Sequence, residues 1–172
     1  RQAYSTLTVE RNKAWKDNLT LFTTDMPHLQ NCARCHFYLA NEQVQQLFKK
    51  AAEHKIPLPQ TTQSIQHHLS EAIRILPTFE DAYFLYAKTL IGFKQYEKAQ
   101  KIAQKGLKHL PNNRGLFYLI GETHYYQNGF ANAITFYEKA QKADLQLQDL
   151  YDHLAWSYFK NTDTEQAINT MS

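Results

Sequence analysis

The chain has 172 residues, enough for one compact domain or a short array of repeats. Gly and Pro number only five each, which favours helices over turn-rich β structure. The formal net charge is only +3, with Lys scattered among acidic and amide side chains, and no apolar stretch approaches about 18 residues; these features argue against nucleic-acid binding and against a membrane span.

Residues 1–31 are predicted to contain a leading helix, because Trp15, Leu19 and Phe22 recur at helical spacing. Pro27 is expected to end this helix. Since it precedes a series of repeated helix pairs, we expect it to cap the exposed face of the first pair.

The segment NCARCH at residues 31–36 has the C-x-x-C-H spacing of c-type haem attachment. It also fits half of a zinc site, a redox dithiol, or the first turn of a helix. Zinc would need two further ligands. Haem would have to lie against His36, but a helix pair buries that side of the residue. We therefore interpret the motif as structural, with Asn31 as a helix N-cap and neither haem nor metal expected. A disulfide or redox role for Cys32 and Cys35 stays open, because a helix N-terminus lowers thiol pKa values.

Residues 32–79 are predicted to form a degenerate helix pair. The stretch HKIPLPQTTQ between its two helices is expected to be a loop, because Pro57 and Pro59 cannot occupy a helix interior. Thr61 or Thr62 is then expected to cap the second helix.

A sequence period of 34 residues, the spacing from Tyr83 to Phe117, organises the rest of the chain. It predicts the units 80–113, 114–147 and a truncated 148–172. By the same register the pair at 32–79 carries 13 extra residues, which are expected to lie between its two helices. The residues that recur once per period are the aromatics Tyr83, Phe117 and Tyr151, the alanines Ala99, Ala133 and Ala167, and the prolines Pro77 and Pro111.

Within the unit 114–147, Gly121 is expected to let two helices approach closely while Tyr137 fills the space beside it. Asn128 is expected to end the first helix in a left-handed conformation. In the last unit, Thr162-x-x-Glu165 reads as a capping box that starts a second helix.

These residues resemble the tetratricopeptide repeat, whose pattern is W-x2-L-G-x2-Y…A-x3-F…P. The resemblance covers residues 80–172 and, more loosely, residues 32–79. It implies an all-α fold, a right-handed α-solenoid of helix-turn-helix repeats preceded by the leading helix. In this family, one stripe of the first helix of each repeat lines a concave groove.

That stripe carries apolar side chains in every unit and a charge in each of the last three. Its aromatics are suited to holding a peptide, with Lys88 and Glu122 setting its orientation at the rim. The alternative is that the rings only pack against the next repeat. The predicted groove residues are Phe37, Asn41, Phe84, Lys88, Tyr118, Glu122, Tyr125, Trp156 and Phe159.

Residues 10–42 are similar to the junction after the last membrane span of transmembrane-and-tetratricopeptide glycosyltransferase-like proteins. This resemblance implies a longer, membrane-anchored parent, with the repeats outside the cytoplasm in a periplasm or lumen; without it, the repeats would be cytoplasmic. The matching residues are Arg11, Asn12, Trp15, Asp17, Leu21, Phe22, Asp25, Asn31, Ala33, His36, Leu39, Ala40 and Asn41.

Two functions are therefore expected. The first is a non-catalytic protein–protein interaction scaffold that binds a protein or peptide in the aromatic groove. The alternative is an accessory extracytoplasmic domain of a membrane glycosyltransferase-like protein. The sequence has no HExxH, GxGxxG, P-loop or GxSxG motif, so we predict neither enzyme activity nor a cofactor.

Overall fold

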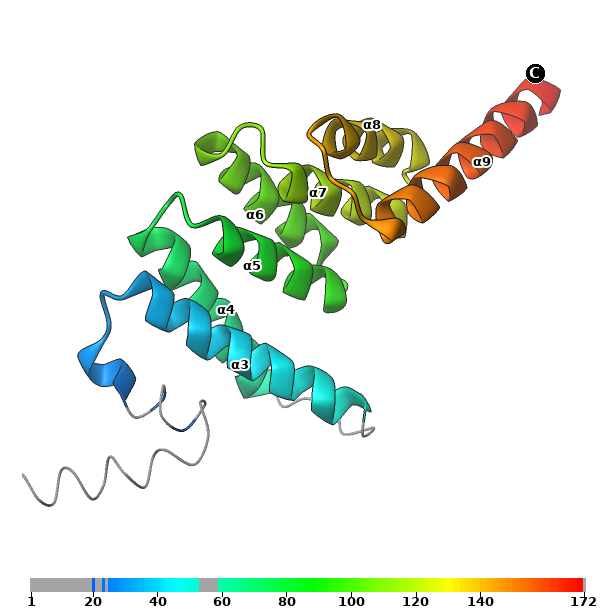
Figure 1. Cartoon of the computed structure of the whole chain (residues 1–172). Helices are drawn as coiled ribbons and strands as arrows, with labels where there is room; N and C mark the ends of the chain where they lie inside the picture. The colour runs from blue at the N-terminus through cyan, green and yellow to red at the C-terminus, as the bar shows by residue number, and fades with distance from the viewer. Residues whose placement is uncertain (1–19, 21–22, 24, 53–58, 172) are drawn as a thin grey trace, which may run out of the picture. The chain divides into compact units, whose positions relative to one another are not determined.

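The computed structural model describes residues 20, 23, 25–52 and 59–171 of the chain. Within these ranges it contains a short 3₁₀ helix, η1, and seven α-helices, with no strand (Figure 1). The chain divides into two compact units, unit 1 (Arg1–Ala82) and unit 2 (Tyr83–Ser172). The all-α prediction is therefore confirmed. None of the described helices is both long and apolar enough to cross a membrane.

Unit 1 is built on a pair of helices, α3 (Ala33–Ala52) and α4 (Pro59–Ile75), that pack against each other (Figure 1). η1 (Met26–His28) precedes them, and its Met26 is buried. The key residues of the predicted leading helix, Trp15, Leu19 and Phe22, lie outside the described residues. The core of the pair consists of Leu39, Ala40, Val44 and Leu47 from α3 and Ile65, Leu69, Ala72 and Ile73 from α4.

Most of the extra length of the first pair lies in its helices rather than in the connection. α3 has 20 residues against 13 in α5 (Glu80–Gly92), and α4 has 17 against 14 in α6 (Tyr96–His109). The prediction that Thr61 or Thr62 caps the second helix is wrong. α4 begins at Pro59, because proline has no N–H to lose in the first turn and its fixed φ suits a helix start.

The N-cap of α3 is Cys32, one residue later than the predicted Asn31. Its carbonyl oxygen accepts the first helical hydrogen bond, from the N–H of His36 at 3.1 Å. Its Sγ also accepts from the N–H of Cys35 at 3.2 Å. The sulfur therefore partners an amide that has no acceptor within the helix.

Unit 2 contains most of α5 and all of α6. Three further helices follow, α7 (Arg114–Tyr126), α8 (Phe130–Lys142) and α9 (Gln148–Met171). From α6 onward, each helix packs against the next (Figure 1). α5 and α6 lie within residues 80–113, and α7 and α8 lie within residues 114–147. Lys94 and Asn128, which lie one sequence period apart, end the first helix of each pair with φ values of 57° and 61°. The predicted left-handed conformation of Asn128 is therefore confirmed.

The structure of the last predicted repeat, residues 148–172, differs from the prediction. α9 runs without interruption from Gln148 to Met171, so the expected second helix does not start at Thr162. Thr162 follows Asn128 by one further period, but a β-branched residue is strained at positive φ. Its hydroxyl instead donates to the carbonyl of Tyr158 at 3.0 Å, a bond typical of threonine inside a helix.

The approach of α7 to α8 is set by Gly121 and Tyr137. A Cβ added at Gly121 would lie 2.6 Å from two carbons of the Tyr137 ring. Gly106 is similar, since a Cβ there would lie 2.6 Å from Leu116 and 3.0 Å from the ring of Tyr83. Both tyrosines are fully buried. The prediction of a close approach at Gly121 is confirmed.

We predict that Gly121→Ala destabilises the chain. The added methyl overlaps the Tyr137 ring, whose burial leaves it no room to move, so overpacking should cost about 1–3 kcal/mol despite the better helix propensity of alanine. Gly92→Ala is the matched control, because no atom lies within 4 Å of its added Cβ. Urea denaturation followed by circular dichroism measures both. Equal stability of the two variants would contradict the close contact.

Candidate functional site

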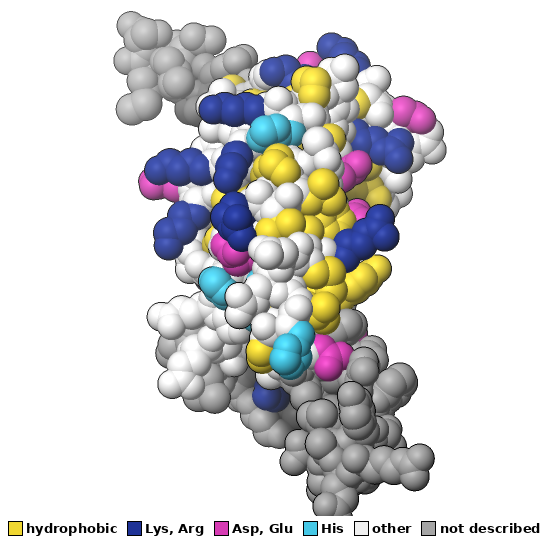
Figure 2. All heavy atoms as spheres, turned by 90° about the vertical axis from the view of Figure 1, so that its left-hand side faces the viewer, with side chains coloured by type: hydrophobic (Ala, Val, Ile, Leu, Met, Phe, Trp, Pro, Cys, Tyr) yellow, Lys and Arg dark blue, Asp and Glu magenta, His cyan; other side chains and the backbone are white. Residues whose placement is uncertain are grey.

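The surface that Figure 2 shows carries basic side chains interspersed with acidic and apolar ones. This distribution agrees with the scattered charge of the sequence. The predicted groove residues fall in both units, with Phe37 and Asn41 in unit 1 and the other seven in unit 2. Phe37 and Asn41 are half-buried, and the Phe37 ring packs on Phe79 with centroids 5.0 Å apart.

On α5, Lys88 is exposed and its Nζ lies 6.0 Å from the centroid of the Phe84 ring. Phe84 is half-buried and lies against α7, where a Cβ added at Gly115 would come within 3.0 Å of it. Phe84 therefore packs in part against the next repeat, as the alternative interpretation of the stripe expected. Lys88 is accessible.

Tyr118 and Glu122 differ from the expectation of an accessible groove. Their exposed fractions are 8% and 6%. The Glu122 Oε1 accepts from the Tyr137 hydroxyl at 2.6 Å and from Nδ1 of His153 at 2.6 Å. Because Tyr137 lies on α8 and His153 on α9, this carboxylate joins three helices. Glu122 is thus a buried acceptor within the protein and is not a charge at the rim.

The electrostatics of this cluster follow from burial. Burial, together with the charge of Glu122, raises the pKa of the Tyr137 and Tyr118 hydroxyls far above the usual range. Tyr137 therefore stays protonated and remains a hydrogen-bond donor at any physiological pH.

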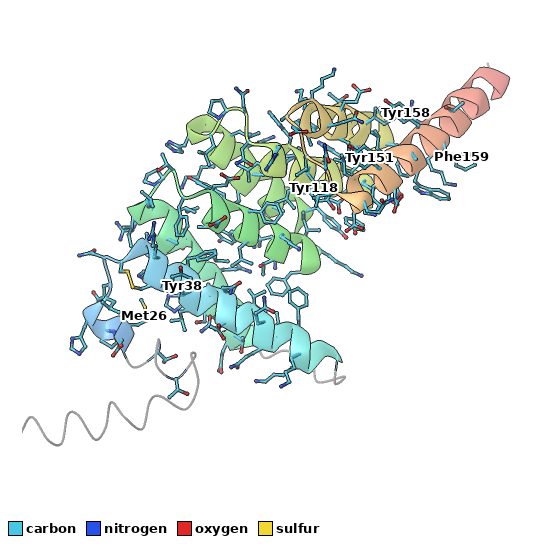
Figure 3. The ribbon with its side chains drawn as sticks, viewed as in Figure 1. Met26, Tyr38, Tyr118, Tyr151, Tyr158 and Phe159 are labelled. Atoms are coloured by element: carbon cyan, nitrogen blue, oxygen red, sulfur yellow. A yellow bond between two sulfur atoms is a disulfide. The ribbon has the colours of Figure 1, made fainter. Side chains whose placement is uncertain are left out.

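Apart from Lys88, the accessible side chains of the predicted groove in unit 2 include aromatic rings on α7 and α9. The ring of Tyr125 stacks on His153 at 4.3 Å. Trp156 and Phe159, on the next turns of α9, are 47% and 55% exposed, with ring centroids 5.5 Å apart. Figure 3 shows Phe159 on the side of α9 away from α8 and Tyr158 on the side toward it. We call Tyr125, Trp156 and Phe159 the aromatic surface.

The residues of NCARCH are also engaged within the protein. Cys32 and Cys35 form a disulfide, and both residues are partly exposed. His36 is buried, and its Nε2 contacts the carbonyl oxygen of Gln30 at 3.1 Å. Since a carbonyl only accepts, Nε2 carries the proton, and Nδ1 of His36 accepts from Nδ1–H of His68 at 2.9 Å. Both ring nitrogens of His36 therefore have protein partners, which argues against haem ligation.

A cavity of about 430 Å³ lies beside this histidine pair. Burial, followed by the neighbouring imidazoles of His36 and His67, lowers the pKa of His68 to about 4. Glu71 is held by Arg74 at 2.8 Å. Within the described ranges, no group of three or more His, Cys, Asp or Glu could hold a metal ion. The lining residues are Thr23, Met26, Pro27, Gln30, His36, His67, His68 and Glu71.

The chain offers a matched pair of hydrogen bonds that tests the buried cluster. Tyr137 donates to Glu122 inside the protein, and Tyr158 donates to Glu138 at its surface, both at 2.6 Å. Tyr137→Phe leaves a buried carboxylate with one donor fewer and should cost about 1–3 kcal/mol in the free energy of unfolding. Tyr158→Phe should cost under about 0.5 kcal/mol, because water replaces the lost donor. Equal losses by urea denaturation would contradict the role of Glu122.

His68 should make the folded state sensitive to acid. Its pKa is about 4 when folded and near the ordinary value of 6.5 when unfolded. Between these values the unfolded chain binds more protons, so stability is fully present above pH 6.5 and is lost as pH falls toward 4. After allowance for solvent screening of this half-buried ring, the loss should be about 1–2 kcal/mol.

His68→Asn keeps an N–H that can reach His36 but removes this titration, so its stability should vary less over the same pH window. Urea midpoints measured between pH 7 and pH 4 compare the two proteins. A variant with the same pH dependence as the natural chain would assign the acid sensitivity to other groups.

Comparison with known proteins supports the fold. A family model described as "Tetratricopeptide repeat" matches residues 115–146, which span α7 and α8. No curated protein matches the chain. Among solved structures, "MamA RS-1 ArsTM double mutant" is similar with a TM-score of 0.66 at 15% identity, covering 98% of this chain and 86% of that one. "MamA 41-end from Desulfovibrio magneticus RS-1" is similar with a TM-score of 0.65 at 15% identity, covering 98% and 89%. The chain thus has the fold of an all-α tetratricopeptide solenoid.

Proposed function

We propose that the chain is a non-catalytic protein–protein interaction scaffold and that unit 2 binds a polypeptide segment on its aromatic surface. The observation that carries this proposal is the pair Trp156 and Phe159, which lie side by side on α9 with about half of each residue exposed. Neighbouring large rings on a surface are typical of binding sites, because their burial against a partner supplies much of the affinity.

The surroundings of the rings indicate the chemistry of the ligand. Lys160 lies 5.0 Å from the centroid of the Trp156 ring, so a cation already occupies one side of it. Asp152, one turn before Trp156, is exposed. We infer a ligand with apolar anchors for the rings and a basic side chain for Asp152. Lys88 on α5 offers the opposite charge, so that the two fix the direction of the segment.

Selection from a random peptide display library on the immobilised chain tests this proposal. Enriched peptides should carry aromatic or aliphatic anchors. Trp156→Ala combined with Phe159→Ala should weaken their binding by about 10-fold or more, since each buried ring contributes about 1–2 kcal/mol. The melting temperature should change little, because neither ring is part of the buried core.

Phe48→Ala is the matched control. Phe48 is also 55% exposed, but it lies on α3 in unit 1. It should leave peptide binding unchanged. A library without enrichment, or peptides whose affinity depends on Phe48 as much as on Trp156 and Phe159, would contradict this site.

A second function, that of an accessory domain of a membrane glycosyltransferase-like protein outside the cytoplasm, is supported by one observation. Cys32 and Cys35 are joined, and disulfides persist mainly in oxidising compartments. In this proposal the aromatic surface would present acceptor polypeptides to a membrane enzyme. Protease added to either side of sealed membranes from the native cells tests the location. Cleavage of the repeats from the cytoplasmic side would contradict it.

A further inference from the structure

The Cys32–Cys35 disulfide has no part in the proposed binding of a peptide by unit 2. It joins residues three apart at the start of α3 (Figure 3). We propose that this disulfide is a thiol–disulfide exchange site that accepts two electrons from a dithiol of a partner protein. This proposal stands on unit 1 alone and does not require the aromatic surface.

Reduction would produce a thiolate at Cys32 that its surroundings stabilise. Its Sγ occupies the N-cap and already accepts the N–H of Cys35 at 3.2 Å. α3 has no acidic residue in its first turn, and the exposed Arg34 lies between the two cysteines. The helix dipole and the amide favour negative charge on this sulfur, and Arg34 adds a positive charge to the same first turn. Stabilising the reduced form makes a disulfide a stronger oxidant.

The disulfide contributes little to the stability of the fold. A disulfide between residues three apart closes a very short loop, so it removes little freedom from the unfolded chain. Backbone hydrogen bonds already hold the chain on both sides of Cys32, from its N–H to the Leu29 carbonyl at 2.9 Å and from the His36 N–H to its carbonyl at 3.1 Å.

The disulfide is also accessible to a partner. Exchange needs a thiolate to reach a sulfur of the disulfide, and both cysteines are partly exposed. Their neighbours Ala33 and His36 are buried. The disulfide therefore lies at the surface of the helix start while the residues beside it anchor that helix start in unit 1.

The exchange has two steps. A thiolate of the partner attacks Sγ of Cys32, a mixed disulfide forms, and Cys35 leaves as a thiolate that takes up a proton. The second thiol of the partner loses its proton and attacks the partner's sulfur in the mixed disulfide, and Cys32 leaves as the stabilised thiolate. The partner ends as a disulfide and the chain as a dithiol, so two electrons pass from the partner to the chain.

Single-cysteine variants of the full chain test the thiolate. In Cys35→Ser, alkylation of Cys32 by iodoacetamide should reach half its maximal rate about 1 unit or more below the ordinary thiol pKa of about 8.5. In Cys32→Ser, Cys35 should react with an ordinary pH dependence and about 10-fold more slowly at pH 7. The same ordinary pH profile for both cysteines would overturn the proposal.

The exchange itself is tested by mixing the oxidised chain with a reduced, unstructured peptide that contains two cysteines, without oxygen. Mass spectrometry should show peptide disulfide and chain dithiol forming in equal amounts, and Arg34→Glu should slow this reaction several-fold. Lys49→Glu, the same charge change in the last turn of α3, should not. A chain disulfide that stays oxidised while the peptide stays reduced, or equal rates for the two charge variants, would overturn the proposal.

Discussion

The contact between Tyr137 and Gly121 determines much of unit 2. Because Gly121 has no side chain, the Tyr137 ring fits between α7 and α8 at a distance that a Cβ would prevent. The position of that ring places its hydroxyl 2.6 Å from Glu122, which also accepts from His153 on α9. His153 in turn stacks on Tyr125. One glycine therefore affects the helix spacing, the buried acceptor and the support of the aromatic surface.

This chain of contacts explains why the predicted groove divides into two kinds of residue. Tyr118 and Glu122 belong to the stripe of α7 that was predicted to line a groove, but Tyr137 of α8 and His153 of α9 contact this stripe. Trp156 and Phe159 lie further along α9 and remain exposed. The buried residues hold three helices together, and the exposed rings remain available to a partner.

The sequence period predicted helices between residues 80 and 147, where α5 to α8 lie, because small residues and rings must recur wherever two helices meet. It could not predict how Glu122 is used. Periodicity places a side chain around its own helix, whereas its partners Tyr137 and His153 are 15 and 31 residues away. The same limit applies to Tyr151, which shares the register of the buried Tyr83 but is 40% exposed. α9 continues to Met171, so among the described residues no helix after it packs over this ring.

The remaining differences between the sequence predictions and the structure follow from the chemistry of single residues. Cys32 replaces Asn31 as the N-cap because its sulfur and its carbonyl are both in place as acceptors. Thr162 stays helical where Asn128 turns, because only the asparagine tolerates positive φ easily. The cavity beside His36 and His68 could not be predicted from the short sequence motif around His36. Its prediction needs the packing of α3 against α4, which the motif does not determine.

In the proposed function, the exposed rings of Trp156 and Phe159 bind a partner while the buried cluster around Glu122 stays unchanged. Nuclear magnetic resonance of the chain, titrated with a peptide from the library selection, tests it most directly. The account predicts that the indole N–H resonance of Trp156 shifts, whereas the ring resonances of Tyr137 and Tyr118 keep their positions. Shifts at Tyr137 and Tyr118 with an unchanged Trp156 would contradict it.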